Sequence, residues 1–148
     1  MRLRRKRYLF RAFRKRRDLK LLCDRTDKIG EDSILCFATM RNEMSRLPYF
    51  LKYYRSLGIG HFLFIDNGSD DGSIEYLKRQ PDVSVWYTEK SYRAARFGAD
   101  WLNWLLRKYG SHHWTLTVDL DELLVYPFCD TRPLRALTDW IKDISTLL

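Results

Sequence analysis

The sequence predicts an α/β fold in which a mostly parallel sheet is covered by helices. Two observations predict it. Short, continuous apolar runs, typical of strands buried on both faces, alternate with longer segments whose apolar residues recur at helical spacing. The 148-residue chain also has 45% hydrophobic residues, enough for the core of about one domain. Such strand–helix alternation builds a parallel sheet with helices on both faces.

Four strands are predicted, each from an apolar run of strand length bounded by polar, Gly or Pro residues. Ile34–Thr39 is the clearest because six consecutive residues carry no charge. Parallel strands covered by helices on both faces have this composition. The predicted strands cover residues 34–39, 61–65, 83–87 and 114–118.

Each of the first three strands is followed by a predicted helix, and a further helix follows the fourth strand. We expect Ser45 to cap the first helix, with Pro48 in its first turn and Gly58 ending it. We expect Ser73 to cap the second helix. The predicted helices cover residues 47–57, 73–80, 94–109 and about 133–141.

The net charge of +8 comes from the N-terminus. Residues 1–20 hold eleven Lys or Arg and one acid, whereas the remaining residues hold sixteen basic and eighteen acidic residues. We therefore assign residues 1–33 to a basic extension and linker, with the linker over residues 23–33, and residues 34–148 to the folded domain. Two interpretations of residues 1–22 stay open: a solvated, frayed extension, or a helix lying on an anionic membrane surface.

Three cysteines, Cys23, Cys36 and Cys129, are widely spaced and odd in number. They predict neither a disulfide framework nor a structural zinc site, and Cys36 reads as a packing residue within a strand. The sequence has no apolar run of signal-peptide or membrane-span length. We therefore expect a cytoplasmic protein. If residues 1–22 form a helix on an anionic membrane surface, that helix would hold the protein against the inner face of the membrane.

Asp119 and Asp121 directly follow the fourth predicted strand. Residues two apart in extended chain point to the same side, so both carboxylates can face one ligand. Two anions held together repel unless a cation lies beside them, and carboxylate oxygens suit Mg²⁺ or Mn²⁺. This D-x-D motif therefore predicts a divalent metal site, although an isolated motif this short is more often a solvated turn.

The loop Asp66–Ser73 follows the second predicted strand and reads D-N-G-S-D-D-G-S. Gly68 and Gly72 allow tight turns with positive φ. A loop that only joined a strand to a helix would need these glycines, but it would not need three acids within six residues. We therefore expect the acids to bind a ligand. In parallel sheets ligands bind beyond the carboxyl ends of the strands, so this loop and the D-x-D motif should lie together.

These motifs resemble those of the family 2 glycosyltransferases and their relatives, which have a GT-A fold. The loop Asp66–Ser73 is similar to the family's D-D-G-S-x-D-G-[ST] loop, and most similar to members that write it D-N-x-S-x-D-G-S. Val118–Asp121 is similar to the strand that ends in D-x-D, Met40–Glu43 to the first nucleotide-contacting loop, and Arg93–Gly98 to the A-R-N-x-G segment. The resemblance covers roughly residues 34–126.

The resemblance implies the following nucleotide-sugar contacts. Asn42 and Glu43 would border the nucleotide, Asp66 would contact the base, and Arg96 would contact the nucleotide. Asn67 also belongs to this site, at a position where the family usually has a second Asp. An Asn there keeps an acceptor oxygen but loses the charge, which leaves the preferred base open.

The resemblance also implies the metal site. Asp121 would ligate Mn²⁺ or Mg²⁺, and Asp119 would face the ribose or the metal. Phe97 stands where the family usually has Asn. The implied activity is transfer of a sugar from a nucleotide-diphosphate sugar to a saccharide, lipid or protein acceptor.

The family normally continues for at least a hundred further residues, which supply the acceptor site and a general base. We see no candidate for that base, and we expect the chain to be a donor-binding portion, C-terminally incomplete, with little or no turnover. Two other functions stay open. One is a metal-dependent nucleotidyltransferase or phosphohydrolase, because D-x-D also serves phosphoryl chemistry. The other is a nucleic-acid-binding protein that binds through the basic tail, against which the acid-lined loops argue.

Overall fold

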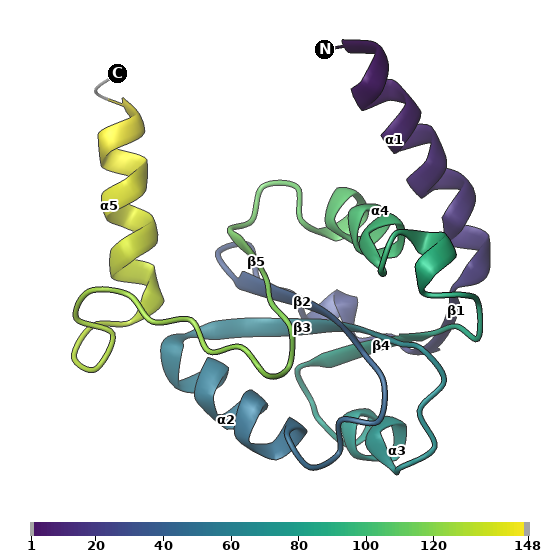
Figure 1. Cartoon of the computed structure of the whole chain (residues 1–148). Helices are drawn as coiled ribbons and strands as arrows, with labels where there is room; N and C mark the ends of the chain where they lie inside the picture. The colour runs from purple at the N-terminus through teal and green to yellow at the C-terminus, as the bar shows by residue number, and fades with distance from the viewer. Residues whose placement is uncertain (1, 147–148) are drawn as a thin grey trace.

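A computed structural model describes the backbone of residues 2–146 and the side chains of residue 8 and residues 10–145. Leu147 and Leu148, which end the predicted domain, lie outside the described residues. The structure has a single five-stranded sheet with the strand order β1-β4-β3-β2-β5 (Figure 1). Neighbouring strands are parallel except β1, which pairs antiparallel with β4. The strands are β1 (Lys20–Cys23), β2 (Ile34–Met40), β3 (Ile59–Asp66), β4 (Val83–Tyr87) and β5 (Thr115–Thr117). The predicted α/β fold is thus confirmed.

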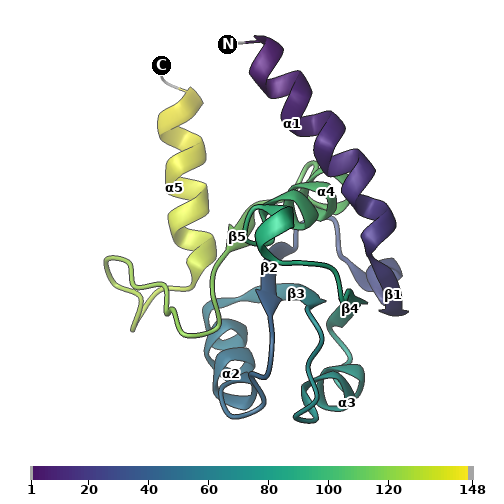
Figure 2. The ribbon, with the colours of Figure 1, turned by 45° about the vertical axis from the view of Figure 1, so that its right-hand side comes forward.

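Helices cover both faces of this sheet (Figures 1 and 2). On one face, α2 (Leu47–Leu57) and α3 (Ser73–Lys78) pack on the larger apolar cluster. On the other face, α4 (Ala99–Tyr109) packs on a smaller cluster through Trp101 and Leu105, which are fully buried. All seven residues of β2 are buried, because successive side chains enter opposite clusters.

The boundaries of α2 and α3 follow the sequence, but their caps do not. Gly58 ends α2 in the left-handed conformation, with φ 98°. Arg46, and not Ser45, precedes α2, and no side chain caps it. Gly72, and not Ser73, precedes α3; Ser73 lies inside the helix with its hydroxyl bonded to Asp71. Both serine caps were therefore predicted wrongly.

The predicted helix over residues 94–109 is interrupted. A 3-10 turn, η3 (Arg93–Ala95), is followed by three residues with positive φ, and α4 begins only at Ala99. Towards the C-terminus, β5 has three residues where five were predicted, and α5 (Leu134–Thr146) continues beyond the predicted end. No described helix is both long and apolar enough to cross a membrane.

The N-terminal segment differs most from the prediction. Residues 2–15 form α1 (Arg2–Lys15), followed by two 3-10 turns, η1 (Arg16–Asp18) and η2 (Thr26–Lys28), on either side of β1. β1 covers the edge of β4, with Leu21 paired to Trp86. Ala12 of α1 is buried. Of the two interpretations left open for residues 1–22, the helix is the one that the structure shows for residues 2–15, and it packs on the domain; β1 and η2 lie where the end of the extension and the linker were expected.

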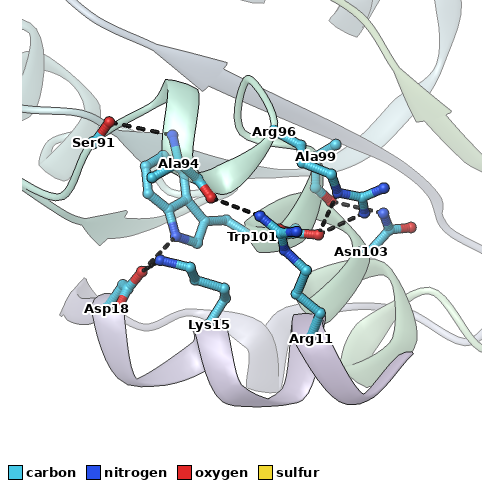
Figure 3. A network of polar contacts seen from close by, with 10 residues as sticks. Arg11, Lys15, Asp18, Ser91, Ala94, Arg96, Ala99, Trp101 and Asn103 are labelled. Carbon is cyan, nitrogen blue, oxygen red and sulfur yellow. Dashed lines mark hydrogen bonds and ion pairs between the residues drawn. The ribbon is translucent and has the colours of Figure 1, made fainter. Parts of the chain in front are cut away.

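Two acids anchor α1 and η1 to α4 (Figure 3). Arg11 donates from Nε to Oδ2 of Asp100, at 2.7 Å, and Asp100 is fully buried. Asp18 accepts from Lys15 at 2.8 Å and from the indole of Trp101 at 3.3 Å. Phe13 packs edge-on against Trp104. Long-range polar contacts thus fix a segment whose sequence reads as solvated.

Candidate functional site

The carboxyl ends of three parallel strands bring the chemically unusual loops together. β2 ends at Met40, which lies opposite Asp66 at the end of β3, and β5 runs parallel to β2 on its other side. The loop after β2, the Asp66–Ser73 loop and the segment after β5 therefore lie at one edge of the sheet. This arrangement is the one expected for a ligand site in a parallel sheet.

A cavity of about 340 Å³ opens at this edge. Four of the site residues predicted from the sequence line it: Glu43, Asn67, Asp119 and Asp121. The other lining residues are Thr39, Met40, Arg41, Tyr92 and Leu120. The remaining three predicted residues, Asn42, Asp66 and Arg96, lie outside this lining. The cavity combines carboxylates, one guanidinium and one amide, a set that suits a charged ligand with metal.

Asp119 shows the electrostatic character of the cavity. Burial, together with the negative charges of Glu122 and Asp121, raises the pKa of its carboxyl above the ordinary value. Glu122 Oε2 also accepts from the Asp119 backbone N–H, at 3.4 Å. The ionised state of Asp119 is therefore disfavoured, and a bound cation would relieve the repulsion.

Two tyrosines of α2 hold the segment that carries these acids. The buried Tyr54 hydroxyl donates to the carbonyl of Glu122 at 3.0 Å and accepts from the N–H of Leu124 at 3.1 Å. Tyr53 donates to the carbonyl of Leu124 at 2.7 Å. A segment with no regular strand hydrogen bonds is thus fixed against a helix of the core.

The first two loops are linked by side-chain hydrogen bonds. Ser69 Oγ accepts from Asn42 N–H at 2.8 Å, and Asn42 Oδ1 accepts from Asp70 N–H at 2.9 Å. Asp71 accepts from the N–H of Met44 at 2.8 Å through one oxygen and from Ser73 through the other. Asn42 therefore joins the two loops through its backbone N–H and its side-chain oxygen, and it does not line the cavity.

Hydrogen bonding also sets the charge state of Asp71. Burial opposes ionisation, but the hydrogen bonds from Ser73 and from the N–H of Met44 outweigh it and lower the pKa of the Asp71 carboxyl. Asp71, one of the acids that we expected to bind a ligand, therefore has a structural role and joins its own loop to the loop after β2.

Asp66 is likewise structural in this conformation. Its side chain is fully buried, and Oδ1 accepts from the N–H of Ser69 at 2.9 Å. Asp66 follows Phe62 and Phe64 at alternate positions of β3, so it lies on the face covered by α2 and α3. Oδ2 has no hydrogen-bond partner among the described residues. Direct contact between Asp66 and a base would require the loop above it to open.

Asn67 has a clear reason to be an amide. Its Nδ2 donates to the carbonyls of Thr88 and Lys90, both at 3.0 Å, and so ties the end of β3 to the loop after β4. A carboxylate could donate neither bond. Its Oδ1 is left as an acceptor at the cavity.

Arg96 is held away from the cavity lining. Its guanidinium donates twice to Oδ1 of Asp100, at 2.8 and 2.5 Å (Figure 3). The same guanidinium lies over the ring of Tyr8, 4.6 Å from the ring centroid. The backbone nearby approaches the cavity, because a Cβ on Gly98 would lie 2.8 Å from Thr39 Cγ2 and 2.9 Å from Tyr92 Cε2. The segment therefore shapes the cavity wall through Tyr92, while Arg96 faces α1.

A divalent cation at the cavity would need ligands beyond those that the protein supplies. Among the described side chains, no group of three or more His, Cys, Asp or Glu is arranged to hold a metal ion alone. Mg²⁺ commonly takes one or two protein carboxylates and completes its shell with substrate phosphates and water. Asp119 and Asp121 provide oxygen donors of the required kind, so the residues fit a metal that arrives with a phosphate ligand.

Sequence reasoning missed Arg41 and Tyr92 as residues of the site. Arg41 could have been found, because it directly follows the first strand and precedes two predicted site residues. Tyr92 gives no comparable signal, because its place at the cavity depends on the interrupted segment before α4. Two further residues with chemically versatile side chains have ordinary structural roles: Trp101 is buried in the core, and a ring nitrogen of His113 lies 3.0 Å from the carbonyl of Ser33.

Searches of the chain against protein-family models, curated proteins and solved structures give no significant match.

Proposed function

We propose that the cavity binds a nucleotide-diphosphate sugar together with Mn²⁺ or Mg²⁺, and that the chain serves as the donor-binding part of a glycosyltransferase. One observation carries the proposal: Asp119 and Asp121 line the same cavity as Glu43, Arg41 and Asn67, which follow two other strands. The resemblance of the loop and D-x-D motifs to family 2 glycosyltransferases supports it independently.

Electrostatics supports a metal-bound diphosphate in particular. Burial and neighbouring acids raise the pKa of Asp119, so added negative charge would be repelled unless a cation came with it. Asp121 and Asp119 would hold the metal through carboxylate oxygens. A divalent ion there would neutralise the charge of a departing diphosphate.

The other lining residues have roles that follow from their chemistry. Arg41 is exposed and supplies a positive charge for phosphate oxygens. Asn67 presents an acceptor oxygen, and Tyr92 provides an aromatic wall. We assign no residue of this chain to acid–base catalysis.

The test is a titration of UDP-, GDP- and dTDP-sugars against the chain by calorimetry, with and without Mn²⁺. We expect binding of at least one sugar nucleotide only with metal, and its loss in Asp121→Ala. Asp70→Ala is the matched control, because Asp70 is an exposed acid of the neighbouring loop and does not line the cavity. Binding of equal strength without metal would refute the role of Asp121.

A metal-dependent nucleotidyltransferase or phosphohydrolase is the second candidate, because the same carboxylates suit phosphoryl chemistry. Product analysis separates the two. Release of sugar phosphate or pyrophosphate would favour the second candidate, whereas a glycoside and a nucleoside diphosphate would favour the first.

A further inference from the structure

The helix α1 has one face fixed to the domain and one face open. Arg11 and Ala12 lie on the fixed face, where Arg11 bonds the buried Asp100 and Ala12 is 3% exposed. Phe10 and Arg14 lie on the open face, and Arg17 follows in the adjoining turn η1; all three are exposed, and Phe10 is 64% exposed. Figures 1 and 2 both show α1 projecting past α4, away from the sheet. The open face is thus presented at the margin of the molecule.

The open face carries positive charge that the domain does not neutralise. Asp18 is the only acid among residues 1–20, and it already pairs with Lys15 at 2.8 Å. Asp100 is engaged by Arg11 and Arg96. Neither Arg14 nor Arg17 has an acidic partner among the described side chains. A negatively charged surface is the complement that this face lacks.

An exposed aromatic residue among arginines indicates which kind of anionic surface fits. Phe10, which is largely exposed, would enter the boundary between headgroups and acyl chains, while Arg14 and Arg17 would remain at the phosphates. The rest of the chain carries a net charge of about −2, with acids lining the cavity. A flat membrane would meet only the projecting helix, whereas a nucleic acid wrapping the domain would meet these acids.

We propose that the open face of α1 and η1, defined by Phe10 and Arg14 of α1 and Arg17 of η1, binds an anionic lipid surface. The contact is peripheral and reversible, because one helix inserts one aromatic ring and relies on basic residues for the rest. Each basic side chain near an anionic membrane raises partitioning roughly fivefold at low ionic strength. The proposal is independent of the nucleotide-sugar site.

The test is co-sedimentation of the full chain with two kinds of vesicle. One kind is phosphatidylcholine alone, and the other contains about 30% phosphatidylserine, which gives the vesicle a strong negative surface potential. We expect binding only with phosphatidylserine, falling as salt is added. Arg14→Gln combined with Arg17→Gln should weaken partitioning by about 25-fold, the product of two fivefold effects. Phe10→Ala should weaken it severalfold, and this loss should persist at high salt.

The matched control is Lys78→Gln with Arg79→Gln, which removes the same charge from exposed positions at the end of α3, on the opposite face of the sheet. We expect this pair to change binding by less than about twofold, because α3 lies on the other side of the sheet from α1 and salt screens charges at such separations. Circular dichroism and urea melts establish that each variant is folded. Equal losses in the two pairs, equal binding to phosphatidylcholine alone, or binding of single-stranded RNA but not of vesicles would each overturn the proposal.

Discussion

Arg11 of α1 donates a 2.7 Å hydrogen bond from Nε to Oδ2 of Asp100, a fully buried carboxylate of α4. The same carboxylate binds Arg96 through Oδ1, so one acid holds two arginines that are 85 residues apart in sequence. The basic N-terminal helix is thereby connected to the segment that shapes one wall of the candidate cavity.

Arg11→Gln is expected to lower the free energy of unfolding by about 1 kcal/mol. The hydrogen bond is charge-assisted, but Arg11 is half exposed and solvent screens the pair. Urea denaturation measures the change. Arg14→Gln on the open face of α1 serves as the control and should have little effect. Equal effects of the two substitutions would show that Asp100 does not anchor the helix.

Gly98→Ala tests how closely the segment before α4 packs on the cavity wall. Gly98 has φ 78°, and an added Cβ would meet Thr39 and Tyr92 at less than 3.0 Å. We expect the free energy of unfolding to fall by about 3 kcal/mol, from backbone strain and overpacking together. Gly68→Ala isolates the strain, because Gly68 also has φ 78° but no atom within 4 Å of the added Cβ. Its expected loss is about 1 kcal/mol, and a loss as large as that of Gly98→Ala would refute the close packing.

Asn67→Asp tests why this position is an amide. The substitution removes both hydrogen bonds to Thr88 and Lys90 and turns a negative oxygen towards two carbonyls. The free energy of unfolding should fall by roughly 1–3 kcal/mol. Asn42→Asp is the control, because Asn42 uses its oxygen to accept from Asp70 and an Asp keeps that acceptor. An unchanged melting curve for Asn67→Asp would contradict the assigned role.

Asp119 gives the stability of the protein a pH dependence of definite sign. Its pKa is raised in the folded state by burial, Glu122 and Asp121, so its protonated form is favoured by folding. The stabilising contribution is present below the ordinary carboxyl pKa and is lost as pH rises through the folded pKa. Asp119→Asn should therefore raise the free energy of unfolding at neutral pH by a few tenths of a kcal/mol, since the exposed site is screened. A loss of stability at neutral pH in this variant, absent in Asp70→Asn, would contradict the repulsion.

The central strands of the sheet could be predicted from sequence because their apolar composition reflects their burial on both faces. The seven residues of β2 are all buried, and an unbroken apolar run is what burial on both faces demands. β1 could not be predicted this way, because Lys20–Cys23 is a four-residue edge strand whose place depends on pairing with β4, more than 60 residues away. The interruption at Arg96–Gly98 was missed for the same reason, because Gly98 packs close to Thr39 of β2, which lies 59 residues earlier in the sequence.

The candidate site was predicted in part. The ends of parallel strands must meet at one edge, so Asp119 and Asp121 could be expected beside the loop after β3. The roles of Asp71 and Asp66 could not be expected, because the N–H groups that they accept from belong to loops whose folded course the sequence does not reveal. Residues with the composition of a ligand site therefore serve partly to hold the loops together.

The most direct test of the nucleotide-sugar site is the Mn²⁺ dependence of sugar-nucleotide affinity in the wild type, Asp121→Ala and Asp70→Ala, measured by titration calorimetry on folded protein. We predict that Mn²⁺ is required for binding by the wild type and by Asp70→Ala, and that Asp121→Ala shows no binding with or without it. Undiminished, metal-dependent binding by Asp121→Ala would contradict the proposal that this acid-lined cavity holds a metal-bound diphosphate.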